Sequence, residues 1–432
     1  MAPSKTIAHK AGWNIISVEG SPKERGFQHG SLLSAQFNPL VETFSYALKT
    51  QHKYSLEEYI ALCSKGRSYF DTHKCCAEWK EELEGMVEGA LSRGVVITID
   101  FLFAWNMYLG MDPYLNSPIK RRRNEDENPD DRVSSIRRNA EKSSHCSAFI
   151  ATGDATKDGQ IVMGHNTHCD FIWATFTNIV QHVKPEKGHP FVIQTLPGLL
   201  CSSTDWFLSS SGIIGCETTI ADTNYLPQFG KPYFCRIREC IQYADSLDDC
   251  VRIMREDNAG DYPCGWMFGD TNTNEIMLLE VAKTVAEPRR TKSGVFYGAN
   301  FAHDSFIRDK QTANNEEIHN LSTSIGSRNA RLDWLLNKVY WGRLDVKTAK
   351  RVIADHFDPY KNKTRRGSRS ICKHSVRFGA IDGKVVDSKM AKKLRFWGRW
   401  GSSCGTAFNM SRKQKKAYPH VPDLKSEPWT TV

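Results

Sequence analysis

The sequence has no apolar run of the roughly 20 residues that a membrane-spanning helix needs, and Met1 to Trp13 contain no apolar core of signal-peptide length. It also lacks the C-x-x-C spacing that is typical of structural zinc sites. Its 13 cysteines are odd in number and irregularly spaced, which argues against a complete disulfide framework. We therefore predict a soluble, thiol-reduced, cytoplasmic protein that uses neither a metal nor a cofactor.

The chain is moderately basic. Its 432 residues carry a formal charge of +9, and 40% of them are hydrophobic, which is enough for one large core with an appended helical part. The positive charge is spread along the chain, so we do not expect nucleic-acid binding. It favours anionic partners, such as peripheral contact with an acidic membrane surface, although a solvated basic surface explains it equally well. The oligomeric state is left open.

Hydrophobic spacing divides the chain into helical and strand regions. Helical spacing occurs in residues 31–70, 77–92, 233–256 and 328–356. Alternating or short apolar runs predict strands in residues 12–19, 265–282 and 294–300 and a series of antiparallel strands in 146–220. Because strands and helices come in blocks rather than in alternating units, the pattern predicts the α+β class.

Residues 118–145 differ from the rest of the chain in composition. A basic run from Lys120 to Arg123 precedes an acidic cluster between Glu125 and Asp131, and aliphatic side chains are almost absent. Such a segment buries too little apolar surface to order itself. We interpret it as a charged, flexible linker; a localisation or phosphate-binding patch is the alternative.

Cys146 follows this linker directly and opens a predicted β-hairpin. Two short apolar runs flank a loop that ends in Asp158-Gly159, which is a strong hairpin signal. If the chain is cut between His145 and Cys146, the new terminal residue carries both a thiol and an α-amine. The thiolate is a good nucleophile, and the amine, with a pKa of about 7.7–8.0, is suited to be its general base. A small buried side chain at the start of a strand is the alternative interpretation of Cys146.

Several segments, including this hairpin, resemble the phospholipase B-like proteins, which are N-terminal-nucleophile (Ntn) hydrolases. The resemblance is carried by Cys146-Ser147-Ala148, Gly164-His165-Asn166-Thr167, 196–200, 205–212, Glu217-Thr218-Thr219 and 379–385. More distantly, 20–30 and 81–89 resemble the isopenicillin-type acyltransferases, a family of cysteine-nucleophile enzymes. Within the first of these segments, glycines at 20, 26 and 30 permit close backbone approach.

The resemblance implies an αββα sandwich, in which two antiparallel sheets lie between helical layers. It divides the chain into a mostly helical proenzyme part (1–117), the linker (118–145) and an Ntn-hydrolase core with a C-terminal extension (146–432). It also implies self-cleavage before Cys146, although His145 stands where the acyltransferases carry glycine. Since the phospholipase B-like relatives typically have secretory signals and act in lysosomes, a lysosomal or secreted location is the alternative to the cytoplasm.

Candidate site residues also follow from the resemblance. The catalytic candidates are Cys146 as nucleophile, His165 to orient or tune the thiol, Asn300 as an oxyanion donor, and Arg328, which is suited to bind a carboxylate or phosphate. The substrate-binding candidates are Asn166, His168 and Thr218. Thr218 and Thr219 lie on opposite faces of one predicted strand, so only one faces the site, and Thr218 is the prediction. At this place His168 replaces the Trp or Asp of the relatives.

These residues predict an autoprocessed N-terminal-cysteine hydrolase of acyl esters or amides, with a lipid as the expected substrate. The first alternative is an amidase or acyltransferase acting on small N-acyl compounds. The second is an inactive protein with the same fold that binds a lipid or a partner.

Overall fold

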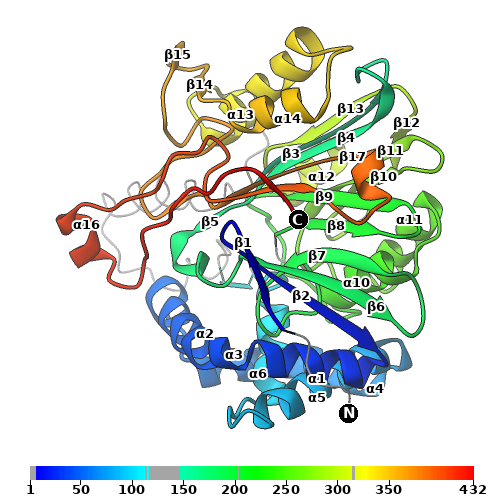
Figure 1. Cartoon of the computed structure of the whole chain (residues 1–432), viewed down its shortest axis with the longest axis vertical. Coiled ribbons are helices and arrows are strands. Elements are labelled where there is room, and N and C mark those ends of the chain that lie inside the picture. The colour runs from blue at the N-terminus through cyan, green and yellow to red at the C-terminus, as the bar shows by residue number, and fades with distance from the viewer. Residues whose placement is uncertain (1–5, 112–113, 116–145, 203, 314–316) are drawn as a thin grey trace.

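Two stacked β-sheets with helices on their outer sides make up the core of the molecule (Figure 1). The computed structural model describes residues 6–111, 114–115, 146–202, 204–313 and 317–432. The predicted linker 118–145, including His145, lies outside the described residues. The α+β class and the two-sheet core between helical layers are confirmed.

The larger sheet has nine strands in the order β1-β2-β6-β7-β8-β9-β10-β11-β12. Their bounds are β1 Ala8–Lys10, β2 Trp13–Gly20, β6 Ile179–Pro185, β7 Phe191–Thr195, β8 Trp206–Ser209, β9 Ile213–Thr219, β10 Cys264–Asp270, β11 Glu275–Val281 and β12 Arg289–Thr291. All neighbours are antiparallel except β2 and β6, which pair in parallel from Asn14 opposite Ile179 to Gly20 opposite Pro185. The part of the chain before the linker therefore extends the sheet of the part after it.

The smaller sheet has six strands in the order β13-β3-β4-β17-β18-β19. They are β3 Ser147–Gly153, β4 Gly159–Asn166, β13 Gly294–Gly298, β17 Asp382–Asp387, β18 Trp397–Trp400 and β19 Thr430–Thr431. Strands β3 and β4 form the predicted hairpin, in which Ser147 lies opposite Asn166 and Ala148 opposite His165. Two further pairs of short strands form separate two-stranded sheets, β5 His168–Asp170 with β16 Phe378–Ala380, and β14 Phe357–Asp358 with β15 Lys363–Thr364.

Apolar side chains fill the space between the two sheets. Ile150 and Ile161 of the smaller sheet pack over Gly269 and Ile214 of the larger one, and all three isoleucines are fully buried. A Cβ atom added to Gly269 would lie 2.8 Å from Ile150 Cδ1, so the glycine makes room for the facing sheet. Each such side chain contributes about 1.5–3 kcal/mol when it leaves water, which is why this layer holds the fold together.

The helices lie before, between and after the strands of the core. Those before the linker are α1 Pro22–Leu32, α2 Ser34–Ala47, α3 Leu56–Leu62, α4 Ser64–Thr72, α5 Ala77–Leu91 and α6 Ile99–Met107. Those after it are α10 Tyr233–Tyr243, α11 Leu247–Arg255, α12 Ser305–Gln311, α13 Ser324–Trp334, α14 Val346–Ile353, α15 Ser388–Ala391 and α16 Arg412–Ala417. Among the described residues, none of the helices has both the length and the apolarity that crossing a bilayer requires.

Helices α1 and α5 pack very closely because each carries two glycines four residues apart. Gly26 and Gly30 of α1 face the backbone of α5, while Gly85 and Gly89 of α5 face the backbone of α1. A Cβ atom added at Gly30 would lie 2.1 Å from the carbonyl oxygen of Met86. The prediction that glycines 26 and 30 permit close backbone approach is thus confirmed, and the two segments that resemble the acyltransferases turn out to be packing partners.

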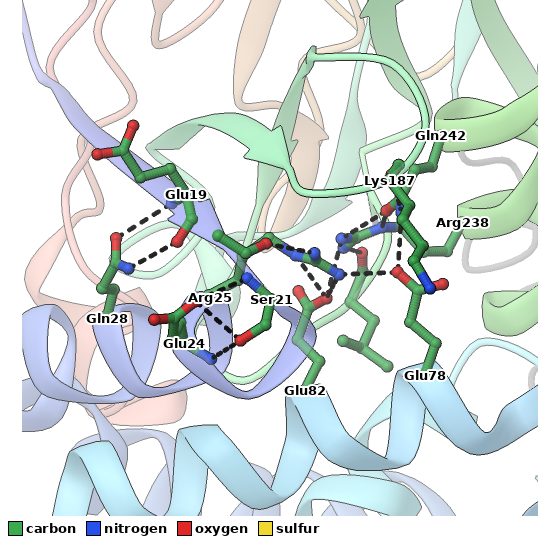
Figure 2. Close-up of polar contacts among 12 residues, drawn as sticks. Glu19, Ser21, Glu24, Arg25, Gln28, Glu78, Glu82, Lys187, Arg238 and Gln242 are labelled. Carbon is green, nitrogen blue, oxygen red and sulfur yellow. Dashed lines mark hydrogen bonds and ion pairs between the residues drawn. The ribbon is translucent and has the colours of Figure 1, made fainter. Parts of the chain in front are cut away.

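A buried ion network joins these two helices to α10 (Figure 2). Arg25 of α1 and Arg238 of α10 both bind Glu82 of α5, at N···O distances of 2.8 and 3.0 Å, and all three side chains are at most 1% exposed. Burial opposes ionisation of Glu82, but the charges of Arg238 and Arg25 outweigh it and lower the pKa of the carboxyl group. Removing Glu82 would leave the buried Arg238 without a carboxylate partner, at a cost of about 3–5 kcal/mol.

Candidate active site

Cys146 lies just before β3 and borders a cavity of about 170 Å³. Only 3% of the residue is exposed to solvent. Its carbonyl oxygen accepts a hydrogen bond of 2.6 Å from Nη1 of Arg328, and the same nitrogen donates to Ser147 Oγ at 2.9 Å. The backbone at the candidate nucleophile is therefore fixed by a buried cation, while the side chain lies at the cavity.

A pair of buried carboxyl groups lies beside the thiol. Sγ of Cys146 is 3.6 Å from Oδ2 of Asp205, and Glu217 of β9 accepts a hydrogen bond of 2.7 Å from the hydroxyl group of Tyr262. Burial raises the pKa of the Cys146 thiol well above its ordinary value, and the charge of Asp205 raises it further, whereas a hydrogen bond from the backbone of His168 lowers it. The thiol is thus protonated at neutral pH in the uncut chain.

The two carboxyl groups hold one proton between them at neutral pH. Burial raises the pKa of Asp205 to about 6, against the opposing effects of the hydrogen bond with Glu217 and of the charge of Lys384. Burial and the charge of Asp205 raise the pKa of Glu217 well above its ordinary value. Glu217 therefore carries the proton and Asp205 the negative charge, so a base lies within hydrogen-bond reach of the thiol.

Lys384 of β17 supplies the positive charge on this side of the site. Its fully buried Nζ donates to Thr167 Oγ1 at 2.8 Å and to Gln194 Oε1 at 2.6 Å, and forms an ion pair of 3.2 Å with Asp382. Asp205, Glu217 and Lys384 received no role in the sequence analysis. Each lies in a segment that carries the family resemblance, but no local pattern distinguishes it from its neighbours.

Arg328 and Asn300 form a second buried unit behind Cys146. Arg328 belongs to α13, and its Nη2 donates a hydrogen bond to Asn300 Oδ1 at 2.8 Å. Nδ2 of Asn300 donates to the carbonyl oxygen of Thr219 at 2.9 Å, and the Asn300 backbone has a φ of 73°. Burial lowers the pKa of Arg328 to about 10, so the guanidinium group remains charged at neutral pH. Both residues bind protein oxygens in this structure, and their predicted roles towards a substrate stay predictions.

The two predicted histidines occupy different positions around the thiol. One ligand atom of His165 lies within 4.8 Å of Cys146 Sγ and of Asp205, although His165 does not line the cavity. His168 does line the cavity, and its Nε2 is 3.0 Å from the carbonyl oxygen of Ile371. Burial lowers the pKa of both rings well below the ordinary value, so both are neutral at physiological pH.

Asn166 lies next to His165 at the end of β4 but outside the cavity lining. Its Nδ2 donates to the carbonyl oxygens of Ile353 and Ile371, at 2.6 and 3.1 Å. These bonds tie the end of the hairpin to two later segments of the chain. The contacts seen here are therefore with the protein backbone, and the predicted contact of Asn166 with substrate stays a prediction.

The strand that carries Thr218 and Thr219 presents the second of them to the site. Thr219 lines the cavity, and its Oγ1 is 2.9 Å from the Tyr262 hydroxyl group. Thr218 faces the other sheet, where a Cβ atom added to Gly298 would lie 2.3 Å from its Oγ1. The choice of Thr218 is therefore corrected to Thr219. The period-two pattern requires opposite faces but does not say which face meets the cavity.

Aromatic and aliphatic side chains form much of the remaining wall of the cavity. Trp105 and Tyr108 come from the region before the linker, and Trp173, Leu196 and Leu199 come from the core. The rings of Trp105 and Trp173 have centroids 5.5 Å apart, and Trp105 Nε1 donates to the carbonyl oxygen of Pro197. Polar residues from several separate segments also line it, namely Gln51, His52, Asp170 and Arg377. The sequence analysis missed these residues because they come together only in the fold.

Proteins of two kinds resemble the chain in sequence. A protein of Archaeoglobus fulgidus that is named "Uncharacterized protein" is 26% identical over 278 residues, which are 63% of this chain and 44% of that protein. "Putative phospholipase B-like 2" of Rattus norvegicus is 26% identical over 149 residues, which are 30% of this chain and 24% of that protein, and its Mus musculus counterpart matches over the same shares. The chain thus spans less than half the length of these relatives. No protein-family model matches it.

Two solved structures of conjugated bile acid hydrolase variants from Clostridium perfringens are also similar. They are 10% identical to the chain, cover 59% of it and 88% and 89% of their own chains, and have TM-scores of 0.33 and 0.34. Scores this low add nothing to the fold, which rests on the sheet topology above. The sequence matches confirm the predicted resemblance of this chain to the phospholipase B-like proteins.

Proposed function

We propose that this protein is an N-terminal-cysteine hydrolase of acyl esters or amides that becomes active when the chain is cut between His145 and Cys146. The observation that carries the proposal is the position of Cys146. Its thiol lies at a largely apolar cavity, 3.6 Å from a carboxylate, and its backbone is held by the Arg328 guanidinium group. The relationship to phospholipase B-like proteins supports the same class of reaction.

The cut itself uses the groups around the thiol. Asp205 accepts the thiol proton, and the sulfur attacks the carbonyl carbon of residue 145. The carbon–nitrogen bond then breaks, the acyl group passes to sulfur, and the nitrogen takes up a proton to become the α-amine of Cys146. Water hydrolyses the resulting thioester and releases the segment that ends at residue 145 with a new carboxyl group.

Turnover repeats this chemistry on a substrate. The freed α-amine, with a pKa of about 7.7–8.0, accepts the thiol proton and replaces Asp205 as the base. The thiolate forms a thioester with the acyl group while the alcohol or amine leaves with the proton. Water then attacks the thioester, which releases the acyl group as a carboxylic acid and regenerates the thiol. The Asn300 amide is the proposed oxyanion donor. In other enzymes, a donor of this kind stabilises the transition state by about 2.7–4 kcal/mol. Here the Asn300 N–H group now donates to the Thr219 carbonyl oxygen and would have to donate to the substrate oxygen instead.

The cavity favours a substrate with one acyl chain. Its volume of about 170 Å³ is below the roughly 300–1,000 Å³ of typical small-molecule pockets, so a whole two-chain lipid does not fit inside it. Trp105, Trp173 and Leu196 are suited to contact hydrocarbon, and the polar part of the substrate would lie towards Arg377. This size equally supports the second candidate function, an amidase or acyltransferase acting on a small N-acyl compound.

Intact-mass analysis and N-terminal sequencing of the purified protein test the proposal. We expect a fragment that begins Cys146-Ser147-Ala148, whereas Cys146→Ala stays a single chain of 49.0 kDa without activity. Cys201→Ala is the matched control, because this residue is also a buried cysteine at the cavity and is expected to permit cleavage. An uncut wild-type chain that hydrolyses neither lysophospholipids nor N-acyl amino acids would instead favour the inactive binding protein.

A further inference from the structure

Four residues with metal-binding side chains come together outside the lining of the active-site cavity. They are His356, Cys372, His374 and Cys404, and the structure places one ligand atom of each within 4.8 Å of the others. His356 follows α14, Cys372 and His374 precede β16, and Cys404 follows β18. Three segments that are distant in sequence thus supply two imidazole rings and two thiols to one point.

The distances between these atoms match a tetrahedral zinc site. The two Nε2 atoms of His356 and His374 are 3.1 Å apart, and Nε2 of His374 is 3.4 Å from both Cys372 Sγ and Cys404 Sγ. Zinc binds histidine nitrogen at about 2.0–2.1 Å and cysteine sulfur at about 2.3 Å, so a tetrahedral ion sets its ligand atoms about 3.3–3.8 Å apart. Only small movements would admit the ion.

The chemistry of the donor set favours the same ion. Two thiolates neutralise the charge of a divalent cation, and two neutral imidazole rings complete four-coordination with no open position. Tetrahedral sites with two sulfur and two nitrogen ligands are typical of zinc, whereas calcium and magnesium prefer oxygen ligands. Cys372 is buried and the other three residues are partly buried, so the cluster is shielded from bulk water without being closed to an ion.

We propose that His356, Cys372, His374 and Cys404 bind a structural zinc ion that fixes one wall of the active site. Ile371, next to Cys372, accepts hydrogen bonds from Asn166 and His168 through its carbonyl oxygen. Ser403, next to Cys404, donates to the carbonyl oxygen of Ile353 at 2.8 Å, and Asn166 donates to that same oxygen. An ion that joins these segments would therefore hold the backbone that positions Asn166 and His168.

This site was absent from the sequence analysis, which predicted no metal because no C-x-x-C pair is present. Cys372 and His374 are only two residues apart, but Cys404 lies much later in the chain. His356 comes earlier and is separated from Cys372 by β14 and β15. No spacing rule for compact zinc motifs covers such a set. The ligands become recognisable only when the fold brings the three segments together.

Metal analysis of the full-length protein tests the proposal independently of any enzymatic activity. We expect the protein purified without chelators to contain about one zinc ion per chain, and Cys372→Ser and Cys404→Ser to lose it. Cobalt added to chelator-treated protein should give thiolate-to-metal charge-transfer bands and the intense visible bands of a tetrahedral ion. Cys75→Ser, which removes an exposed cysteine outside the cluster, should retain full zinc content.

Two further measurements keep the test decisive. Cys146→Ala must still bind zinc, because Cys146, His165 and Asp205 are a second group of ligand-type atoms within 4.8 Å of one another. Loss of zinc in this variant would move the site to the catalytic cysteine and overturn the proposal. It would also be overturned if wild-type protein bound neither zinc nor cobalt in excess metal, or if mass spectrometry of the alkylated protein found Cys372 and Cys404 joined in a disulfide.

Discussion

Replacing Asp205 by asparagine tests the proposed chemistry most directly. Asp205 Oδ2 lies 3.6 Å from Cys146 Sγ, and we propose that it takes the thiol proton before the chain is cut. A positioned general base contributes about 10²–10⁴-fold to the rate of such a step. The amide cannot accept this proton, so Asp205→Asn should slow cleavage by about 10²-fold or more.

The matched control is Glu217→Gln, which makes the same change in the neighbouring carboxyl group. Because burial and Asp205 raise the pKa of Glu217 well above its ordinary value, Glu217 is already neutral at pH 7. Glutamine keeps an oxygen for the hydroxyl group of Tyr262, which now donates to Glu217 at 2.7 Å. We therefore expect the cleavage rate of this variant to stay within a few-fold of wild type.

The cleavage rate should depend on pH in the direction expected if Asp205 accepts the thiol proton. The pKa of Asp205 is raised to about 6, and only its ionised form, which predominates above this value, can accept a proton. Cleavage of the wild-type chain should thus be constant near pH 7–8 and fall about tenfold per pH unit below pH 6. Following the two fragments on gels after in vitro translation and a pH jump measures the rate.

Two results would refute this reasoning. One is cleavage of Asp205→Asn at the wild-type rate while its thermal melting matches that of wild type. The other is faster cleavage at pH 5 than at pH 7. Either would mean that another group accepts the proton of the Cys146 thiol.

Three other predictions concern packing, the buried cation and the cavity. Gly30→Ala should lower the melting temperature, because the new Cβ atom would lie 2.1 Å from a backbone oxygen of α5. This overlap costs about 1–3 kcal/mol, which exceeds the gain of about 1 kcal/mol in helix propensity. Gly367→Ala is the control and should show no such loss, because its Cβ atom would meet only side-chain atoms at 3.5 Å or more. Arg328→Lys should abolish cleavage and lower the free energy of unfolding in urea by about 1–3 kcal/mol for each buried oxygen left unpaired. Arg331→Lys is the control on the same helix. It changes a partly exposed ion pair and should cost about 1 kcal/mol or less. Leu196→Trp should leave cleavage intact but raise KM progressively for longer acyl chains, because the larger ring occupies the cavity. If KM depends on acyl-chain length as it does in wild type, the cavity does not bind the acyl chain.

Local patterns predicted the elements of this fold well. The amphipathic pattern over 77–92 corresponds to α5, Ala77–Leu91, and the hairpin signal at Asp158-Gly159 lies where the β3–β4 turn enters β4. These features depend on periodicity and on turn residues, which act over a few residues. The parallel pairing of β2 with β6 could not be read in this way, because helices α1 to α6, the linker and the β3–β4 hairpin all lie between the two strands in sequence.

The candidate site divides in the same manner. The sequence by itself was enough to single out Cys146 as the candidate nucleophile, because its place between a charged segment and a hairpin is a local feature. The resemblance to phospholipase B-like proteins pointed to Arg328 and Asn300 as further candidates. Only the tertiary structure decided that Asp205 lies beside the thiol, that Thr219 rather than Thr218 faces the cavity, and that Trp105 from the other side of the linker forms part of its wall. The same holds for the proposed zinc ligands, which come from three separate segments. The pKa of a group and the chemistry of a site depend on neighbours within a few ångströms, and most of these neighbours are brought together by sheet pairing and packing rather than by proximity along the chain.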